Sequence, residues 1–124
     1  MNNILILGSG GREHSIAWSL FQGNKKLNLF CAPGNGGTSS IAKNISIDIN
    51  QNKDVLDIIK KYNIDCTIVG PENPLNNGIV DYLEKKGYKV FGPSKLAAQL
   101  ECSKIFARKF MEKYKIPQPS FFEC

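Results

Sequence analysis

Short apolar runs that alternate with helical patterns constrain this chain more than any other feature. Ile4–Leu7 predicts a buried strand. The helix predicted after it carries four apolar residues on one face, namely Ile16, Ala17, Leu20 and Phe21. Four more strands are predicted, at Leu27–Ala32, at Ile45 and Ile47, at Cys66–Val69 and at Val90–Phe91. Such alternation predicts an α/β fold, with a parallel sheet of about five strands flanked by helices.

Helices are also predicted between the later strands and near the end of the chain. The apolar residues that mark two of these helices are Val55, Ile58, Ile59 and Tyr62 in one, and Ile79, Val80 and Leu83 in the other. Gly87 is placed to end the second of them. Ser94 predicts the start of a short helix, and Ser103 the start of another that runs to about Tyr114.

Composition places the chain among ordinary globular domains. Its 124 residues are 42% hydrophobic and 22% charged, enough for one domain with a real core. No apolar run is long enough to span a membrane, and the start of the chain does not resemble a secretory signal. The net charge is +5, but the basic residues fall on predicted helix faces without interleaved aromatics, so no nucleic-acid partner is expected.

The cysteines predict neither a zinc site nor a disulfide framework. The chain has four of them and a single histidine, without a C-x-x-C pair. Two lie in apolar strand-like segments, where a free cysteine behaves as a small hydrophobic residue. We therefore expect reduced thiols, as in a cytoplasmic protein, at Cys31, Cys66, Cys102 and Cys124.

The glycine-rich segment Gly8–His14 is the strongest local sign of a ligand. It joins the first strand to the first helix, whose first amides lack intrahelical partners and carry partial positive charge. Glycines let a phosphate approach those amides, so the segment favours a phosphorylated ligand over a tight turn that binds nothing. NAD is disfavoured, because Glu13 stands where the dinucleotide motif has its third glycine.

Three polar loops are expected to converge on one edge of the sheet. They follow the first, second and fourth predicted strands, at Gly8–His14, Pro33–Thr38 and Gly70–Leu75. Ligands of parallel α/β sheets bind beyond the carboxyl ends of the strands, so this edge is the predicted binding site.

Five ordered sequence blocks resemble the phosphoribosylamine–glycine ligase family (glycinamide ribonucleotide synthetases) of the ATP-grasp superfamily. They span nearly the whole chain, and the order and spacing of five blocks are far more specific than one glycine loop. The blocks are Gly10–His14, Pro33–Thr38, Ile68–Glu72 with Pro74 and Leu75, Phe91–Pro93, and Ala97–Glu101 with Ser103, Lys104, Ile116 and Pro117.

The resemblance implies a Rossmann-like (pre-ATP-grasp) substrate-binding domain over residues 1–101, followed at 102–124 by a hinge helix and the start of the ATP-grasp region. The implied reaction joins glycine to 5-phosphoribosylamine with ATP, giving glycinamide ribonucleotide, ADP and phosphate in de novo purine synthesis. ATP and magnesium would bind mainly on an ATP-grasp domain outside these residues, so this segment alone is expected to be inactive. A cytoplasmic, monomeric enzyme is implied.

The resemblance also assigns roles to individual residues. None is implied to be catalytic or a metal ligand, and Lys104 is implied to contact ATP phosphates. The implied substrate-binding residues are Gly10, Gly11, Arg12, Glu13, Asn35, Gly36, Gly37, Thr38, Pro71 and Glu72. Chemically, glycine amides and a guanidinium suit a phosphate, whereas a carboxylate suits ribose hydroxyls or an amine.

Two other classes of function remain as alternatives. One is a binding module or nicotinamide-dependent oxidoreductase, although the second predicted strand lacks at its end the acidic residue that NAD sites use. The other is a different ATP-grasp ligase, of purine or biotin-type chemistry. The same residues also have structural alternatives: Arg12 and Glu72 as local ion-pair or capping groups, and His14 as a packed residue. Lys104 has one as well, as an exposed lysine on a helix.

Overall fold

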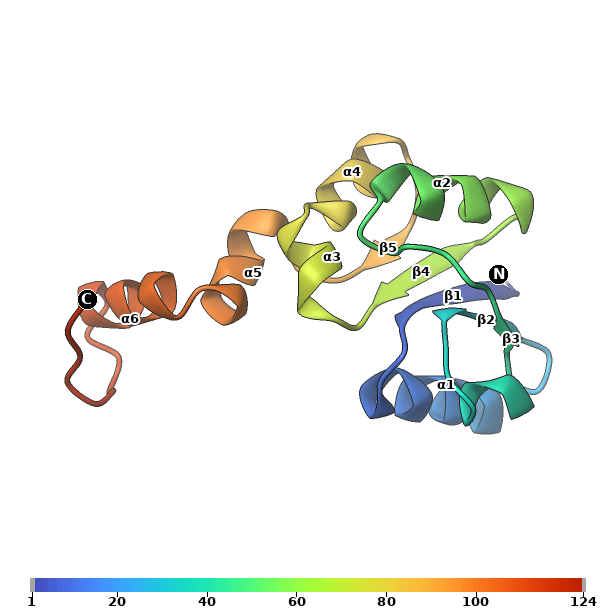
Figure 1. The fold of residues 1–124 in the computed structure, drawn as a ribbon, viewed down its shortest axis with the longest axis horizontal. Coiled ribbons are helices and arrows are strands. Elements are labelled where there is room, and N and C mark those ends of the chain that lie inside the picture. Colours follow the sequence, from blue (N-terminus) through green and yellow to red (C-terminus); the bar gives the residue numbers. More distant parts are fainter. Residues whose placement is uncertain (1, 124) are drawn as a thin grey trace.

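A single parallel sheet forms the centre of the molecule, which confirms the predicted α/β class. The computed structural model describes residues 2–123, and its five strands lie in the order β3-β2-β1-β4-β5 (Figure 1). All neighbouring strands are parallel. The strands are β1 (Asn3–Gly8), β2 (Asn28–Pro33), β3 (Lys43–Asn44), β4 (Cys66–Val69) and β5 (Val90–Phe91).

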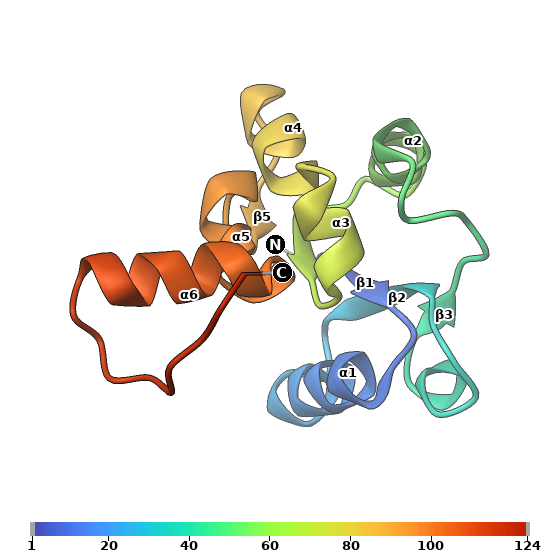
Figure 2. The same ribbon diagram turned by 60° about the vertical axis from the view of Figure 1, so that its left-hand side comes forward.

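Helices cover both faces of this sheet. One face carries α1 (Gly11–Gly23) and the short 3-10 helix η1 (Thr38–Ser40), and the other carries α2 (Asn52–Lys61) and α4 (Ile79–Lys85) (Figure 2). The remaining helices are α3 (Glu72–Asn76), α5 (Lys95–Cys102) and α6 (Lys104–Lys113).

The central strand β1 contributes side chains to two separate cores. Leu5 and Leu7 are fully buried in the core beneath α2 and α4. Ile4 and Ile6 point the other way, into the core beneath α1. Because both faces are covered, the strand is apolar along its whole length, as the sequence predicts for a parallel sheet.

The third strand lies earlier in the sequence than predicted. It comprises Lys43 and Asn44, whereas Ile45 and Ile47 lie in the extended segment that follows it. Pairing with β2 stops as that strand reaches Pro33, which has no amide hydrogen to donate. Ile45 is nevertheless buried, so its apolar character reflects packing against the core rather than membership of the strand.

The segment predicted as the loop Gly70–Leu75 contains a short helix, α3. Five residues are too few for a periodic pattern to show, and Pro74 lies within the first turn, where proline is tolerated. The predicted helix signals elsewhere are confirmed. Ser94 and Ser103 accept hydrogen bonds from the amides of Ala97 and Phe106, and Gly87 follows α4 with a positive φ of 83°.

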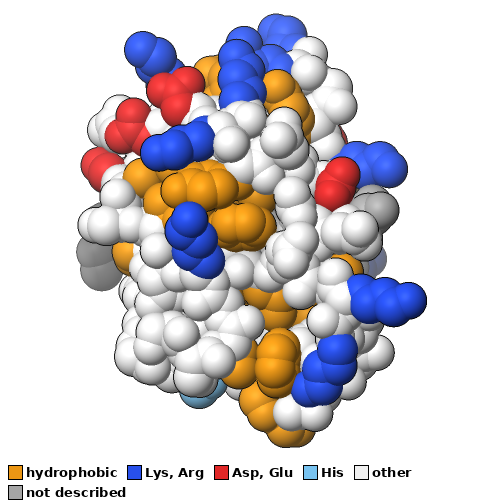
Figure 3. All heavy atoms as spheres, turned by 90° about the vertical axis from the view of Figure 1, so that its right-hand side faces the viewer, with side chains coloured by type: hydrophobic (Ala, Val, Ile, Leu, Met, Phe, Trp, Pro, Cys, Tyr) orange, Lys and Arg blue, Asp and Glu red, His pale blue; other side chains and the backbone are white. Residues whose placement is uncertain are grey.

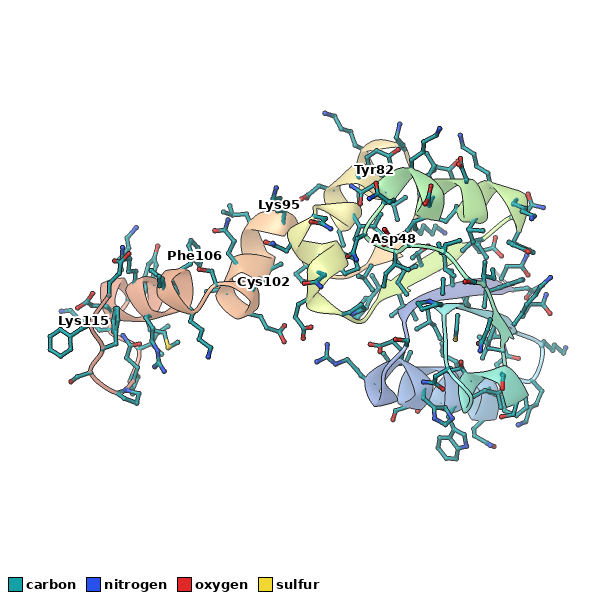
Figure 4. All side chains as sticks on the ribbon, in the orientation of Figure 1. Asp48, Tyr82, Lys95, Cys102, Phe106 and Lys115 are labelled. Atoms are coloured by element: carbon teal, nitrogen blue, oxygen red, sulfur yellow. The ribbon has the colours of Figure 1, made fainter. Side chains whose placement is uncertain are left out.

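Helices α5 and α6 project from the sheet domain as an arm (Figure 1). Helix α5 packs against α3, and α6 packs against α5. The arm begins near Lys95 and runs past Cys102 and Phe106 toward Lys115, which lies at the end farthest from the sheet (Figure 4).

The face at the amino ends of the strands lies opposite the arm. Hydrophobic side chains reach the surface there, and several lysine or arginine side chains lie beside them (Figure 3). On the same side of the sheet domain, the start of β1 is tied down by Asp65, whose Oδ2 accepts hydrogen bonds of 2.9 Å from the amides of Asn2 and Asn3. These two amide donors lower the pKa of the Asp65 carboxyl.

The cysteines Cys31, Cys66 and Cys102 are free thiols, as predicted. Cys31 is fully buried in β2 and Cys66 is half-buried in β4, and burial raises the pKa of both thiols. Cys124 lies outside the described residues.

Candidate functional site

The carboxyl ends of β1, β2 and β4 bring the three predicted loops to one edge of the sheet. Strand order reverses between β1 and β4, because the chain builds outward to β3 on one side and to β5 on the other. In open α/β sheets, ligands bind at such a switch point, near the loops that follow the two strands. The loops here are Ser9–Gly10 and Gly70–Pro71.

The first loop leaves the start of α1 open. Its N-cap residue is Gly10, which has no side chain to accept hydrogen bonds from the first amides of the helix. By contrast, α5 and α6 are each capped by a serine, whose hydroxyl oxygen accepts a hydrogen bond from an amide of the first turn. A methyl group added at Gly11 would meet no atom within 4 Å, so the space beside the first turn of α1 is unobstructed.

Glu13 is buried beneath this open helix end. It is only 4% exposed, and its Oε2 accepts a 2.7 Å hydrogen bond from the amide of Gly10. This contact is the half of a capping box in which a glutamate in the first turn reaches back to the N-cap amide.

Arg12 and Glu72 meet across the switch point. Arg12 Nη1 donates a 2.6 Å hydrogen bond to the carbonyl oxygen of Gly70, and its Nη2 lies 3.3 Å from Glu72 Oε1. Both side chains are about half exposed, so the pair faces solvent at the sheet edge. The amide of Glu72 itself and the Arg12 guanidinium lower the pKa of the Glu72 carboxyl. Arg12 uses two of its five N–H donors in these contacts.

The loop after β2 is held by a network centred on Asn35. Its Oδ1 accepts hydrogen bonds from the amides of Gly37 (2.8 Å) and Thr38 (3.0 Å), and its Nδ2 donates to the carbonyl of Ser9 (2.9 Å). Thr38 is fully buried, and its hydroxyl contacts Asn44 Oδ1 at 2.8 Å. The loop is therefore fixed in shape and fastened to the loop after β1.

Asn44 is a residue that sequence reasoning missed. Its Nδ2 donates a 2.8 Å hydrogen bond to the carbonyl of Asn35, nine positions earlier. It also lies against Gly34, where an added methyl group would collide with the Asn44 amide. No local pattern marks an asparagine in a two-residue strand, so only the folded chain reveals this contact.

The predicted site residues thus fall into three groups. Those at the open edge are Gly10, Gly11, Arg12, Asn35, Gly36, Pro71 and Glu72. Glu13 and Thr38 are buried below it, and Gly37 is covered by the imidazole of His14, whose Nδ1 and Cε1 would block a side chain there. Lys104 lies apart from both, at the first turn of α6 on the arm.

Residues 2–123 contain neither a metal cluster nor a membrane span. Within that range, no three His, Cys, Asp or Glu side chains gather closely enough to hold a metal ion. In the same range, no helix combines the length and apolar character that crossing a bilayer requires.

A known family accounts for most of the chain. Residues 2–101 match the family model described as phosphoribosylglycinamide synthetase, N domain. Over 113 residues, the chain is 47% identical to phosphoribosylamine–glycine ligase from Clostridium acetobutylicum, covering 91% of this chain and 27% of that relative. The corresponding enzyme from Neisseria meningitidis serogroup B is 48% identical over 118 residues, or 95% of this chain and 28% of that relative.

A solved structure agrees with the sequence matches. The crystal structure of phosphoribosylamine–glycine ligase from Thermotoga maritima superposes with a TM-score of 0.65 at 31% identity, covering 91% of this chain and 25% of that one. The chain therefore spans somewhat more than a quarter of the length of the curated relatives it matches. With the match over residues 2–101, this establishes that the chain belongs to the phosphoribosylglycinamide synthetase N-domain family.

Proposed function

We propose that this chain is the amino-terminal, substrate-binding part of an ATP-dependent ligase that joins glycine to 5-phosphoribosylamine. In that reaction the glycine carboxylate takes the terminal phosphoryl group of ATP and releases ADP. The amine of phosphoribosylamine then attacks the acyl carbon, loses a proton and expels phosphate, giving glycinamide ribonucleotide for purine synthesis. The family and the ligase names of the relatives support this proposal.

The observation that carries the proposal is the juxtaposition of a guanidinium, a carboxylate and an open helix end at the switch point. The amides of Gly11 and Arg12 at the start of α1, together with the free N–H groups of the Arg12 guanidinium, suit the phosphate dianion, and Gly10, whose own amide is engaged by Glu13, lets the phosphate approach them. Glu72, with its lowered pKa, stays ionised at neutral pH and accepts hydrogen bonds from ribose hydroxyls or the amine. Arg12 then orients Glu72 as well as binding the phosphate.

The second loop completes the proposed site on its other side. Gly36 has open space where a side chain would be, which admits a sugar close to the backbone. Asn35, Gly37 and Thr38 hold that loop in place through their hydrogen bonds, and Pro71 starts α3 beside Glu72.

ATP and magnesium are assigned to a part of the enzyme outside these residues. Lys104, at the start of α6, is proposed to reach the ATP phosphates from the arm. We accordingly divide the chain into a substrate-binding domain, residues 1–101, and a hinge toward the ATP-binding region, residues 102–124.

The test is the variant Glu72→Ala in the complete enzyme. Hydrogen bonds to a charged group contribute about 1.5–3 kcal/mol each, so kcat/KM for phosphoribosylamine should fall about tenfold or more. The value for ATP should change little, because ATP binds elsewhere. The matched control is Glu84→Ala, which removes an exposed glutamate on α4 and should leave both values unchanged. Equal losses for ATP and phosphoribosylamine, with the fold intact, would show that Glu72 is structural.

A further inference from the structure

The carboxyl group of Glu13 lies in a notch formed by three glycines. A methyl group added at Gly8 would lie 2.6 Å from Glu13 Cδ, and one at Gly70 would lie 2.7 Å from the same atom. At Gly10 the added carbon would be 3.0 Å from Glu13 Oε2. Each distance is shorter than van der Waals contact allows, so any side chain at these positions would push Glu13 out of place.

The notch joins two elements that are distant in sequence. Gly8 ends β1 and Gly10 lies in the turn between β1 and α1, whereas Gly70 directly follows β4. Gly70 is held from both sides by consecutive residues, because Glu13 packs on its Cα and Arg12 donates to its carbonyl oxygen. Its amide also donates a 3.3 Å hydrogen bond to the carbonyl of Leu7.

We infer that Glu13 is a positioning residue, which fixes the loop after β1 against the end of β4 and so sets the spacing between the phosphate-binding amides and Glu72. It does not touch the substrate. Its side chain is 4% exposed and its Oε2 is engaged by the Gly10 amide, so little of it can reach a ligand. This role rests on the proposed function, since that function places the phosphate at the amides of Gly11 and Arg12.

Variants of Glu13 in the complete enzyme test the role, with ribose 5-phosphate as the binding probe. Glu13→Ala removes the side chain that holds the loop after β1 against Gly70, so the phosphate-binding amides are no longer fixed relative to Glu72, and binding should weaken about tenfold or more. The KM for ATP should stay unchanged. Glu13→Gln should bind within about threefold of the unaltered enzyme, because its Oε1 can still accept from the Gly10 amide. Glu84→Ala serves as the control with an exposed carboxylate.

A double variant separates positioning from direct contact. Gly70→Ala displaces the Glu13 carboxyl without removing it, and should weaken ribose 5-phosphate binding by about the same factor as Glu13→Ala. In the Glu13→Ala background the notch is empty and the new methyl group fits, so Gly70→Ala should add less than about twofold. This dependence on background is the result expected of a packing contact between the two residues.

The outcomes distinguish the two proposals. If the unaltered enzyme does not bind ribose 5-phosphate, the proposed function fails, and the role of Glu13 fails with it. If it binds, and Glu13→Ala binds equally well, only the positioning role is overturned. The positioning role is also overturned if Glu13→Gln is as weak as Glu13→Ala while Gly70→Ala is harmless, because the charge of Glu13 would then contact the ligand directly.

Discussion

The sheet domain and the arm are stabilised in different ways. In the sheet domain, long-range contacts bury two cores, and residues such as Leu5, Ile6 and Leu83 are fully enclosed. In the arm, α5 and α6 each bury a single residue, Ala98 and Ala107. Burial of apolar surface therefore stabilises the sheet domain strongly and the arm only weakly.

Helix α6 and the segment after it rely instead on contacts between residues close in sequence. Phe110 lies between Phe106 and Tyr114, with ring centroids 6.4 and 4.7 Å away. Gln118 folds the following segment back by donating a 3.0 Å hydrogen bond to the carbonyl of Arg108. Large apolar side chains remain exposed, including Leu96 at 69%. Local contacts of this kind specify helices but give them little stability of their own.

Hydrogen exchange should show the largest difference between the two regions. Amides of Ile4–Leu7 in β1 lie at the centre of the sheet and exchange only when the domain unfolds, so we expect protection of roughly 10³ to 10⁸. Amides of α6 should be protected less than about 100-fold, because that helix opens locally. The measurement is exchange of the 124-residue chain followed by NMR. Equal protection in both segments would show that the arm is as stable as the sheet domain.

Matched leucine truncations should give the next largest effect. Leu83 on α4 is fully buried, so Leu83→Ala should lower the free energy of unfolding by about 2–5 kcal/mol. Leu96 on α5 is exposed, and Leu96→Ala should change the free energy of unfolding by less than about 0.5 kcal/mol. Urea denaturation of the two variants measures both values. Comparable losses would mean that the exposed face of α5 packs against something in solution.

A smaller effect concerns the anchor at the start of β1. The lowered pKa of Asp65 means that its stabilisation is present above the unfolded pKa of about 3.9 and is lost as the pH falls through the folded pKa. Asp65→Asn should therefore be less stable than the unaltered chain at pH 7, and this difference in stability should become smaller toward pH 3. Thermal unfolding of both proteins across this pH range measures the difference. A difference that does not change with pH would indicate that the variant loses packing, and not an ionised hydrogen-bond acceptor.

Sequence patterns predicted most of the sheet domain because its signals are local. The strands Cys66–Val69 and Val90–Phe91 appear within their predicted bounds, and the serine caps appear where predicted. The third strand was misplaced because isoleucines that pack on the core look the same in sequence as isoleucines in a strand. Helix α3 was missed because five residues are too short to show a helical period.

Sequence patterns were enough to predict the alternation of strands and helices, the three loops that meet at the sheet edge and the family to which the chain belongs. The tertiary structure alone decided how those loops fit together: Arg12 pairs with Glu72, sixty positions away, and Asn44 braces the loop of Asn35. It also placed Glu13 in a notch that Gly8, Gly10 and Gly70 form jointly. Periodicity and capping are properties of neighbouring residues, whereas these contacts exist only once distant segments have packed together.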